Sequence, residues 1–299
     1  MQTNAPAGSE FVDQFNRAVV FQQIRPYVDR NTGSNNTNVG RSALSSPSLS
    51  GNGNTAVGGS SLFLNETGAF NSAVGANSLR ENISGSSNSA FGVNSLYDNT
   101  TGSDNSAVGA NALSNNLQGS NNVAVGVNSL LTNTTGINNS AVGSGALKSN
   151  NGSYNSALGL NALFLNSSGE NNSAVGVGAL QNNEVGSSNS ALGRGALTNS
   201  KGSNNTAVGH NAGSVVTTGS GNVCIGQNAN VNAGARSNCI VLGAGATANL
   251  DGEIAFASTL ATKTTIGANG AATALTALPV GYIRIRIGAT AYQIPYYNV

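Results

Sequence analysis

The chain has 299 residues, a net charge of +1, only 8% charged and 5% aromatic residues, and 40 glycines. Because it lacks a basic surplus, nothing points to nucleic acid or an anionic membrane as a partner, and no apolar run is long enough to predict a transmembrane helix. The shortage of charged residues also sets the chain apart from ordinary globular domains.

Residues 1–34 precede a repetitive region and are expected to form a lead-in or attachment segment. Phe11 and Phe15 recur at helical spacing and Phe21 follows them, although residues 18–24 fit a strand equally well. Two interpretations stay open: a segment that docks onto other virion or surface proteins, and a cap over the first repeat. The first residues lack the pattern of a secretory signal peptide, so we expect either a removed signal or another route of export, such as within a virus particle.

Residues 35–250 repeat a unit of about 17 residues. The unit is Asn-Ser/Thr-Ala-Val-Gly, as in Asn71–Gly75, and its last residue is called here the anchor glycine, position 0. A fixed period predicts one structural unit stacked on itself. The anchor glycines are Gly40, Gly58, Gly75, Gly92, Gly109, Gly126, Gly143, Gly159, Gly176, Gly193, Gly209, Gly226 and Gly243.

Each repeat predicts a coil of strand, turn, strand and turn. Position −1 is always apolar and position +4 is Leu in ten repeats. Because alternate residues of a strand share a face, we expect position −1 to point into the core, position −2 to point outward, and the leucine to lie on a second short strand. The fold class is therefore all-β, a repetitive parallel β-roll or β-solenoid. Its predicted core includes Val57, Leu62, Val74, Leu79, Val108, Leu113, Val125 and Leu130.

Asparagine occupies position −4 in nearly every repeat. Successive coils would stack about 4.8 Å apart, so these side chains are expected to form a ladder that bonds coil to coil. Asn-x-Ser/Thr sequences are interpreted first as turn signals, and they matter for glycosylation only if the chain passes such a pathway. Examples are Asn65, Asn82, Asn99 and Asn133.

A single stack of such coils has little apolar material. Two buried side chains per coil supply roughly 3–6 kcal/mol, whereas ordering each of about 17 residues costs about 1–2 kcal/mol of backbone entropy. We therefore expect several chains to share an apolar face, and a threefold axis suits a fibre best. The predicted partner is the chain itself, as a homotrimer.

The recurring Asn-Ser-Ala-Val-Gly followed by Asn-Ala/Ser-Leu resembles the head repeats of YadA-like trimeric autotransporter adhesins over roughly residues 36–247. The resemblance implies a left-handed parallel β-roll assembled as a trimer. The repeat here is longer than that family's. Similar repeats are also typical of phage and other viral fibre proteins.

No pattern for catalysis, a metal or a cofactor is found, so the chain is interpreted as a non-enzyme without cofactors. His210 is the only histidine and occupies a variable repeat position, which indicates a surface site. Cys224 and Cys239 lie in consecutive repeats. We expect one extra residue to align Cys239 with Val223, so that the two sulfurs diverge as small buried hydrophobes; a disulfide or metal site is the alternative.

Residues 251–299 are expected to form a C-terminal β cap that locks three chains in register. Strands are predicted at 254–256, 264–266, 283–287 and 290–294, with a two-residue turn at 288–289. Arg284 and Arg286 share a face that is either solvated or pairs subunits. The ending resembles C-terminal hairpins of viral structural proteins. Candidate trimer-cap residues are Ile283, Ile285, Ile287 and Tyr292.

The leading functional hypothesis is a structural fibre or spike that projects from a virus particle and mediates attachment, through a host receptor or glycan, at the virion surface or outside the cell. The first alternative is a bacterial trimeric surface adhesin. A remote alternative is an ice-binding solenoid, which needs a flat, regular threonine face.

Overall fold

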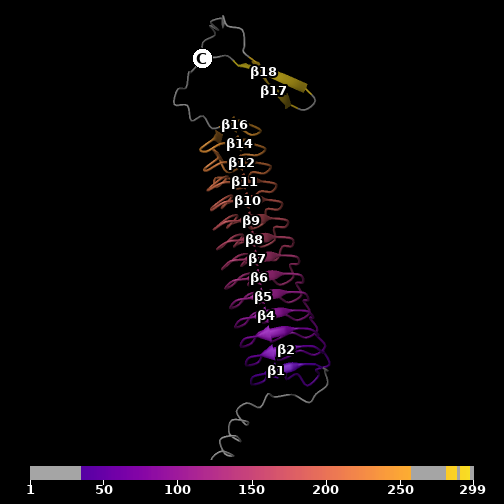
Figure 1. Cartoon of the computed structure of the whole chain (residues 1–299). Coiled ribbons are helices and arrows are strands. Elements are labelled where there is room, and N and C mark those ends of the chain that lie inside the picture. The colour runs from indigo at the N-terminus through magenta and orange to yellow at the C-terminus, as the bar shows by residue number, and fades with distance from the viewer. Residues whose placement is uncertain (1–34, 257–280, 288–289, 297–299) are drawn as a thin grey trace, which may run out of the picture. The chain divides into compact units, whose positions relative to one another are not determined.

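The computed structural model describes residues 35–256, together with the backbone of residues 281–287 and 290–296. Within these ranges the chain is all-β and contains no helix. Residues 35–256 form a parallel β-solenoid of about 13 coils of ~17 residues, stacked one on the next (Figure 1). The predicted fold class is confirmed, and the number of chains in the assembly is a separate question.

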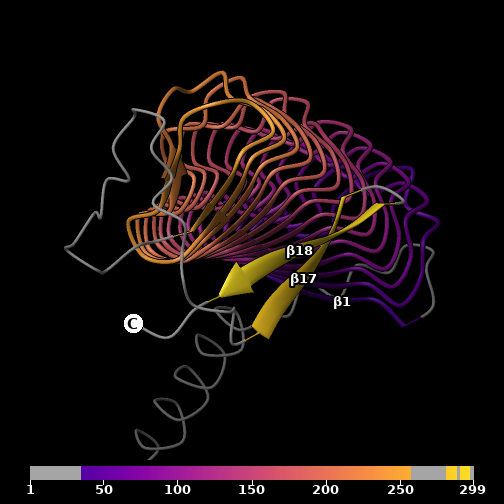
Figure 2. The ribbon, with the colours of Figure 1, turned by 90° about the horizontal axis from the view of Figure 1, so that it is seen from above.

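Each coil contributes one short strand to a single parallel sheet of 14 strands, whose order follows the chain. Equivalent residues pair in register, as in Ser72 with Ser89 and Val74 with Phe91. Figure 2 looks along the stack, and successive coils nearly superpose. The strands are β1 (Thr37–Val39), β2 (Thr55–Val57), β3 (Ser72–Val74), β4 (Ser89–Phe91), β5 (Ser106–Val108), β6 (Val123–Val125), β7 (Ser140–Val142), β8 (Ser156–Leu158), β9 (Ser173–Val175), β10 (Ser190–Leu192), β11 (Thr206–Val208), β12 (Val223–Ile225), β14 (Ile240–Leu242) and β16 (Ile254–Phe256).

The strands turn the opposite face inward from the one predicted. The alanine at position −2, such as Ala107, is fully buried, whereas Val108 beside it is 44% exposed. The inward assignment of position −1 is therefore wrong for the isolated coil stack. Val57, Val74, Val108 and Val125 all lie on the outside, half-buried or exposed.

From β2 to β11 position −2 is always alanine, because leucine and asparagine side chains fill most of the interior; Asn38, Cys224 and Val241 take this position in the first and last coils. Leu62, Leu79, Leu113 and Leu130 are completely buried. A Cβ added at Gly213, which replaces this leucine in its coil, would contact both the Leu197 and Ala207 side chains. The leucine at position +4 thus packs against the alanine at −2, and a larger inward residue there would overfill the coil.

The sequence predicted that the leucines lie on a second strand, and this prediction is wrong. Leu62, Leu79 and Leu113 have φ values of 48°, 49° and 51°, in the left-handed region. A left-handed residue reverses the chain direction within a turn, and the leucine side chain is thereby directed into the coil. Within residues 35–256 a second sheet occurs only in the last coils, where β13 (Asn230–Val231) pairs with β15 (Thr247–Ala248).

Two columns of buried asparagine run inside the solenoid. In the first, at position −4, the Oδ1 of Asn71 accepts a hydrogen bond from the backbone N–H of Asn88 at 2.9 Å, and its Nδ2 donates to Gly85 O at 2.8 Å. The predicted ladder is confirmed, with the main chain as the principal partner. Each side chain thus satisfies backbone groups that would otherwise be buried without a partner.

The second column, at position +7, links side chain to side chain. Asn82 Nδ2 donates to Asn65 Oδ1 at 2.6 Å, and Asn116 Nδ2 donates to Asn99 Oδ1 at 2.7 Å. The column ends at Asn183, whose Oδ1 is the one buried side-chain polar atom without a hydrogen-bond partner among the described residues, because the next coil carries Ser200.

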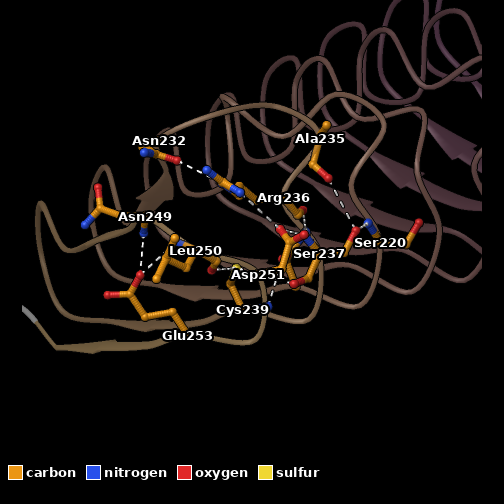
Figure 3. A network of polar contacts seen from close by, with 11 residues as sticks. Ser220, Asn232, Ala235, Arg236, Ser237, Cys239, Asn249, Leu250, Asp251 and Glu253 are labelled. Atoms are coloured by element: carbon orange, nitrogen blue, oxygen red, sulfur yellow. Dashed lines mark hydrogen bonds and ion pairs between the residues drawn. The ribbon is translucent and has the colours of Figure 1, made fainter.

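The final coils replace the columns with a charged network, shown in Figure 3. Glu253 Oε2 accepts hydrogen bonds from the backbone N–H groups of Asn249 and Leu250, at 2.5 and 2.9 Å. Asp251 Oδ1 accepts from Ser237 N at 3.2 Å and lies 3.7 Å from Arg236 Nη1.

Because β16 pairs with β14, the stack extends to Phe256, past the expected boundary at residue 250.

The cysteines both point into the solenoid, so the expected divergence of their sulfurs is wrong. Ile240 pairs with Val223, and Cys239 N donates to Asn222 Oδ1 at 3.0 Å. Cys239 therefore takes the −4 place of the asparagine column, with no inserted residue. Both thiols are free and buried, and burial, with a smaller contribution from Cys239, raises the pKa of Cys224 to about 11.

A second unit, residues 258–299, contains an antiparallel pair, β17 (Gly281–Ile287) and β18 (Thr290–Tyr296). Ile285 pairs with Tyr292, and Ile287 pairs with Thr290, in the predicted order. The turn at 288–289 and the predicted strand at 264–266 lie outside the described residues.

Candidate interaction surface

The outward face of the 14-stranded sheet is uncharged along its full length. Positions −3 and −1 of each strand point outward, and position −3 is mostly Ser or Thr. No Asp, Glu, Lys, Arg or His occurs in either row, from β1 to β16. We call these two rows the outer sheet face. With 13 intervals of about 4.8 Å, it is about 60 Å long.

The −1 row forms a continuous apolar stripe on this face. Twelve of its fourteen residues are between 36% and 71% exposed, and Val57 and Leu242 are half-buried. Apolar patches on monomeric proteins rarely exceed a few hundred Å², and larger ones mark interaction sites. The exposed members are Val39, Val74, Phe91, Val108, Val125, Val142, Leu158, Val175, Leu192, Val208, Ile225 and Phe256.

The other predicted site residues are less fully placed. Phe11, Phe15 and Phe21 lie outside the described residues. The trimer-cap residues Ile283, Ile285, Ile287 and Tyr292 lie on β17 and β18, for which the backbone alone is described. Their proposed role in registering chains stays a prediction.

A column of aromatic and cationic side chains at position +5 had no signal in the sequence analysis. The Arg80 guanidinium carbon lies 5.3 Å from the Phe63 ring centroid and 5.5 Å from that of Tyr97, and Arg80 Nη1 donates to the Tyr97 hydroxyl at 2.7 Å. Arg80 also pairs with Glu81, and burial raises the pKa of Asp98 above its usual range. These groups satisfy one another and stabilise the coil surface.

Four of the Asn-x-Ser/Thr sequences are closed to modification in the folded chain. Asn65, Asn82, Asn99 and Asn133 are fully buried members of the +7 column, and each donates its Nδ2 hydrogens within it, as Asn99 does to Gly102 O at 2.9 Å. Their role is to bind turns and neighbouring coils.

The described residues contain no group of three or more His, Cys, Asp and Glu that could hold a metal ion. No helix in that part of the chain is long and apolar enough to cross a membrane. Comparison with protein-family models, with curated proteins and with solved structures gives no match. The outer sheet face is the candidate interaction surface.

Proposed function

We propose that this chain forms the shaft of a homotrimeric fibre or spike that projects from a virus particle and mediates attachment to a host surface. The observation that carries the proposal is the outer sheet face, which is apolar in its −1 row and uncharged for about 60 Å. Three such faces turned toward a common axis would remove the apolar stripe of every copy from water.

The arrangement also resolves the shortage of apolar material in one coil. Leucine and alanine fill the interior, and the valine outside is available to a neighbouring chain. Burying one such valine supplies roughly 1.5–3 kcal/mol per coil, which adds along the stack. The number three comes from the resemblance to trimeric adhesin heads; the extended stack with its uncharged face fits a fibre shaft.

The proposal is tested by matched charge substitutions in one coil. Val125 lies in the −1 row and is 37% exposed, whereas Val127, two residues later, lies beyond the strand and is 48% exposed. In a trimer, Val125→Asp buries an unpaired charge, which is very costly, so light scattering should report monomers or unstable assemblies. Val127→Asp adds the same charge outside the face and should remain trimeric.

A monomeric wild-type chain at micromolar concentration, or equal assembly of the two variants, would overturn the proposal. Electron microscopy of the wild type is expected to show uniform rods. A bacterial surface adhesin would share this assembly, and it is separated from the viral fibre by locating the chain on purified particles or on cell surfaces.

One structural observation favours the ice-binding alternative, which the sequence pattern had made remote. The Ser/Thr row at position −3 faces outward and is half-buried or exposed beside the valine row. Threonine, however, occurs there only as Thr37, Thr55 and Thr206, and serine is the commonest residue. We therefore expect no ice-growth inhibition by the purified chain, and clear inhibition would replace the fibre proposal.

A further inference from the structure

A concave site lies on the solenoid surface across three consecutive coils, outside the outer sheet face. Its volume is about 420 Å³, within the size range of small-molecule sites. None of its lining residues belongs to a strand of the sheet. The lining residues are Val177, Gly178, Gln181, Arg194, Gly195, Thr198, His210 and Asn211.

The hollow exists because glycine interrupts a third asparagine column, at position +2. From Asn77 to Asn128 this column is continuous: Asn77 Nδ2 donates to Asn94 Oδ1, and Asn94 Nδ2 to Asn111 Oδ1, both at 3.2 Å, whereas Gly145 interrupts it in a single coil. Gly178 and Gly195 take the same position in two successive coils. Two missing side chains in adjacent coils leave a hollow into which neighbouring polar groups reach: Gln181 Oε1 lies over Gly178, and Asn211 Oδ1 lies over Gly195.

A guanidinium and an imidazole stand together at the rim. Arg194 and His210 both occupy position +1, in consecutive coils, so their backbones are about 4.8 Å apart. The Arg194 side chain makes no ion pair or hydrogen bond with any described residue, whereas the side chains of Arg80, Lys201 and Arg236 each have a carboxylate partner. No Asp or Glu lines the cavity. Its electrostatic preference is therefore for an anion.

The remaining lining groups suit a polyhydroxylated molecule. Gln181, Thr198 and Asn211 offer amide and hydroxyl groups that both donate and accept hydrogen bonds. Val177 adds a 48% exposed apolar surface against which a sugar ring can pack. A guanidinium binds carboxylates with paired, charge-assisted hydrogen bonds.

We propose that this cavity binds an acidic sugar, whose carboxylate pairs with Arg194 and whose ring lies beside Val177 and the polar groups of Gln181 and Asn211. The inference deepens the proposed attachment role and rests on it for its biological setting. Because the cavity lies off the outer sheet face, trimer formation through that face leaves it accessible.

The test is calorimetric titration of the full-length chain with sodium glucuronate, with glucose as the neutral counterpart and sodium sulfate as the bare anion. Glucuronate should bind about tenfold or more tightly than either, since charge-assisted hydrogen bonds are about twice as strong as neutral ones. Equal binding of glucose would overturn the role of Arg194, and equal binding of sulfate would overturn the role of the sugar ring.

Three variants locate the site. Arg194→Gln should weaken glucuronate binding at least about tenfold. Gly178→Asn puts back one of the two missing asparagine side chains and narrows the hollow; the φ of 64° at Gly178 is close to the 53° at Asn161, so the fold should be retained. Arg41→Gln is the matched control, because Arg41 holds position +1 in a coil whose neighbour carries Gly59.

Loss of binding in Arg194→Gln and Gly178→Asn but not in Arg41→Gln supports the site. Unchanged binding in Arg194→Gln, or no glucuronate binding by the wild type, overturns it. The outcome is independent of the assembly test, since a monomeric chain that binds glucuronate at this cavity would refute the trimer and keep the site.

Discussion

The regular middle coils and the last coils of the solenoid satisfy their buried backbone in different ways. In the middle, each buried asparagine bonds to the coil before it and the coil after it, as Asn116 does with Asn99 and Asn133. At the end, Cys239 takes the asparagine place, and Glu253 and Asp251 bind backbone N–H groups from outside. A column of identical side chains needs a next coil, so the stack can stop only where other groups replace it.

The largest effect is expected from breaking a column in the middle. Asn116→Ala removes the partners of Asn99 Oδ1 and Asn133 Nδ2 and one of the donors to Gly119 O. Leaving buried polar groups unpaired costs about 1–3 kcal/mol each, so the free energy of unfolding should fall by about 3–5 kcal/mol in denaturant titrations. Asn115→Ala, at the exposed neighbouring residue, should change it by less than about 0.5 kcal/mol. Equal losses would mean that the column contributes nothing specific.

The last coils should instead be sensitive to alkaline pH. The Cys224 thiol is neutral in the folded chain with a pKa of about 11, against an ordinary 9.0. Because the folded pKa is raised, the associated stability is present below pH 9 and is lost as pH rises toward 11, by about 2–3 kcal/mol in total. Cys224→Val should remove this part of the pH dependence; its column neighbours are Ala207 and Val241. Identical profiles for the two proteins between pH 8 and 11 would contradict this.

Extending the column should stabilise the chain. Asn183 Oδ1 has no partner because the next coil carries Ser200. In the equivalent place, Asn150 donates to both Asn133 Oδ1 and Gly152 O. Ser200→Asn should therefore raise the free energy of unfolding by about 1–2 kcal/mol. Thermal melting of the variant beside Ser200→Ala tests this, and a lower melting temperature for Ser200→Asn than for the wild type would refute it.

The smallest effect is expected from the network outside the last coil. Glu253→Ala removes the acceptor for two backbone N–H groups, but these groups are exposed and water replaces it, so the loss should be about 1 kcal/mol. Hydrogen exchange at Asn249 and Leu250 should accelerate. Glu170→Ala, which removes an exposed carboxylate from a middle coil, should leave both unchanged. A loss as large as that of Asn116→Ala would place the network among the principal stabilising elements.

Repetition explains which features could be read from the chain. Every coil carries nearly the same residues at the same positions, so the period, the strand register and the asparagine column at −4 all follow from one repeated unit. The +7 column was interpreted only as a set of turns, because Asn-x-x-Gly is a common turn sequence wherever it occurs. These asparagines form a column only because the turns of adjacent coils lie directly above one another, which places each side chain within hydrogen-bond distance of the next. The Arg194–His210 cavity had no signal, since two glycines at +2 acquire meaning only when adjacent coils are superposed.

The sequence by itself determined the parallel stack and the strand that ends before each anchor glycine, because that apolar unit recurs with a period near 17. Only the tertiary structure decided which strand face is inside. A three-residue strand such as Ser106–Val108 offers two faces, and hydrophobicity alone favours Val108 for the interior. The interior is already occupied by leucine from left-handed turns and by two asparagine columns, so the methyl group of Ala107 fits and valine does not. Packing volume set the orientation, and it placed the apolar stripe where another chain can reach it.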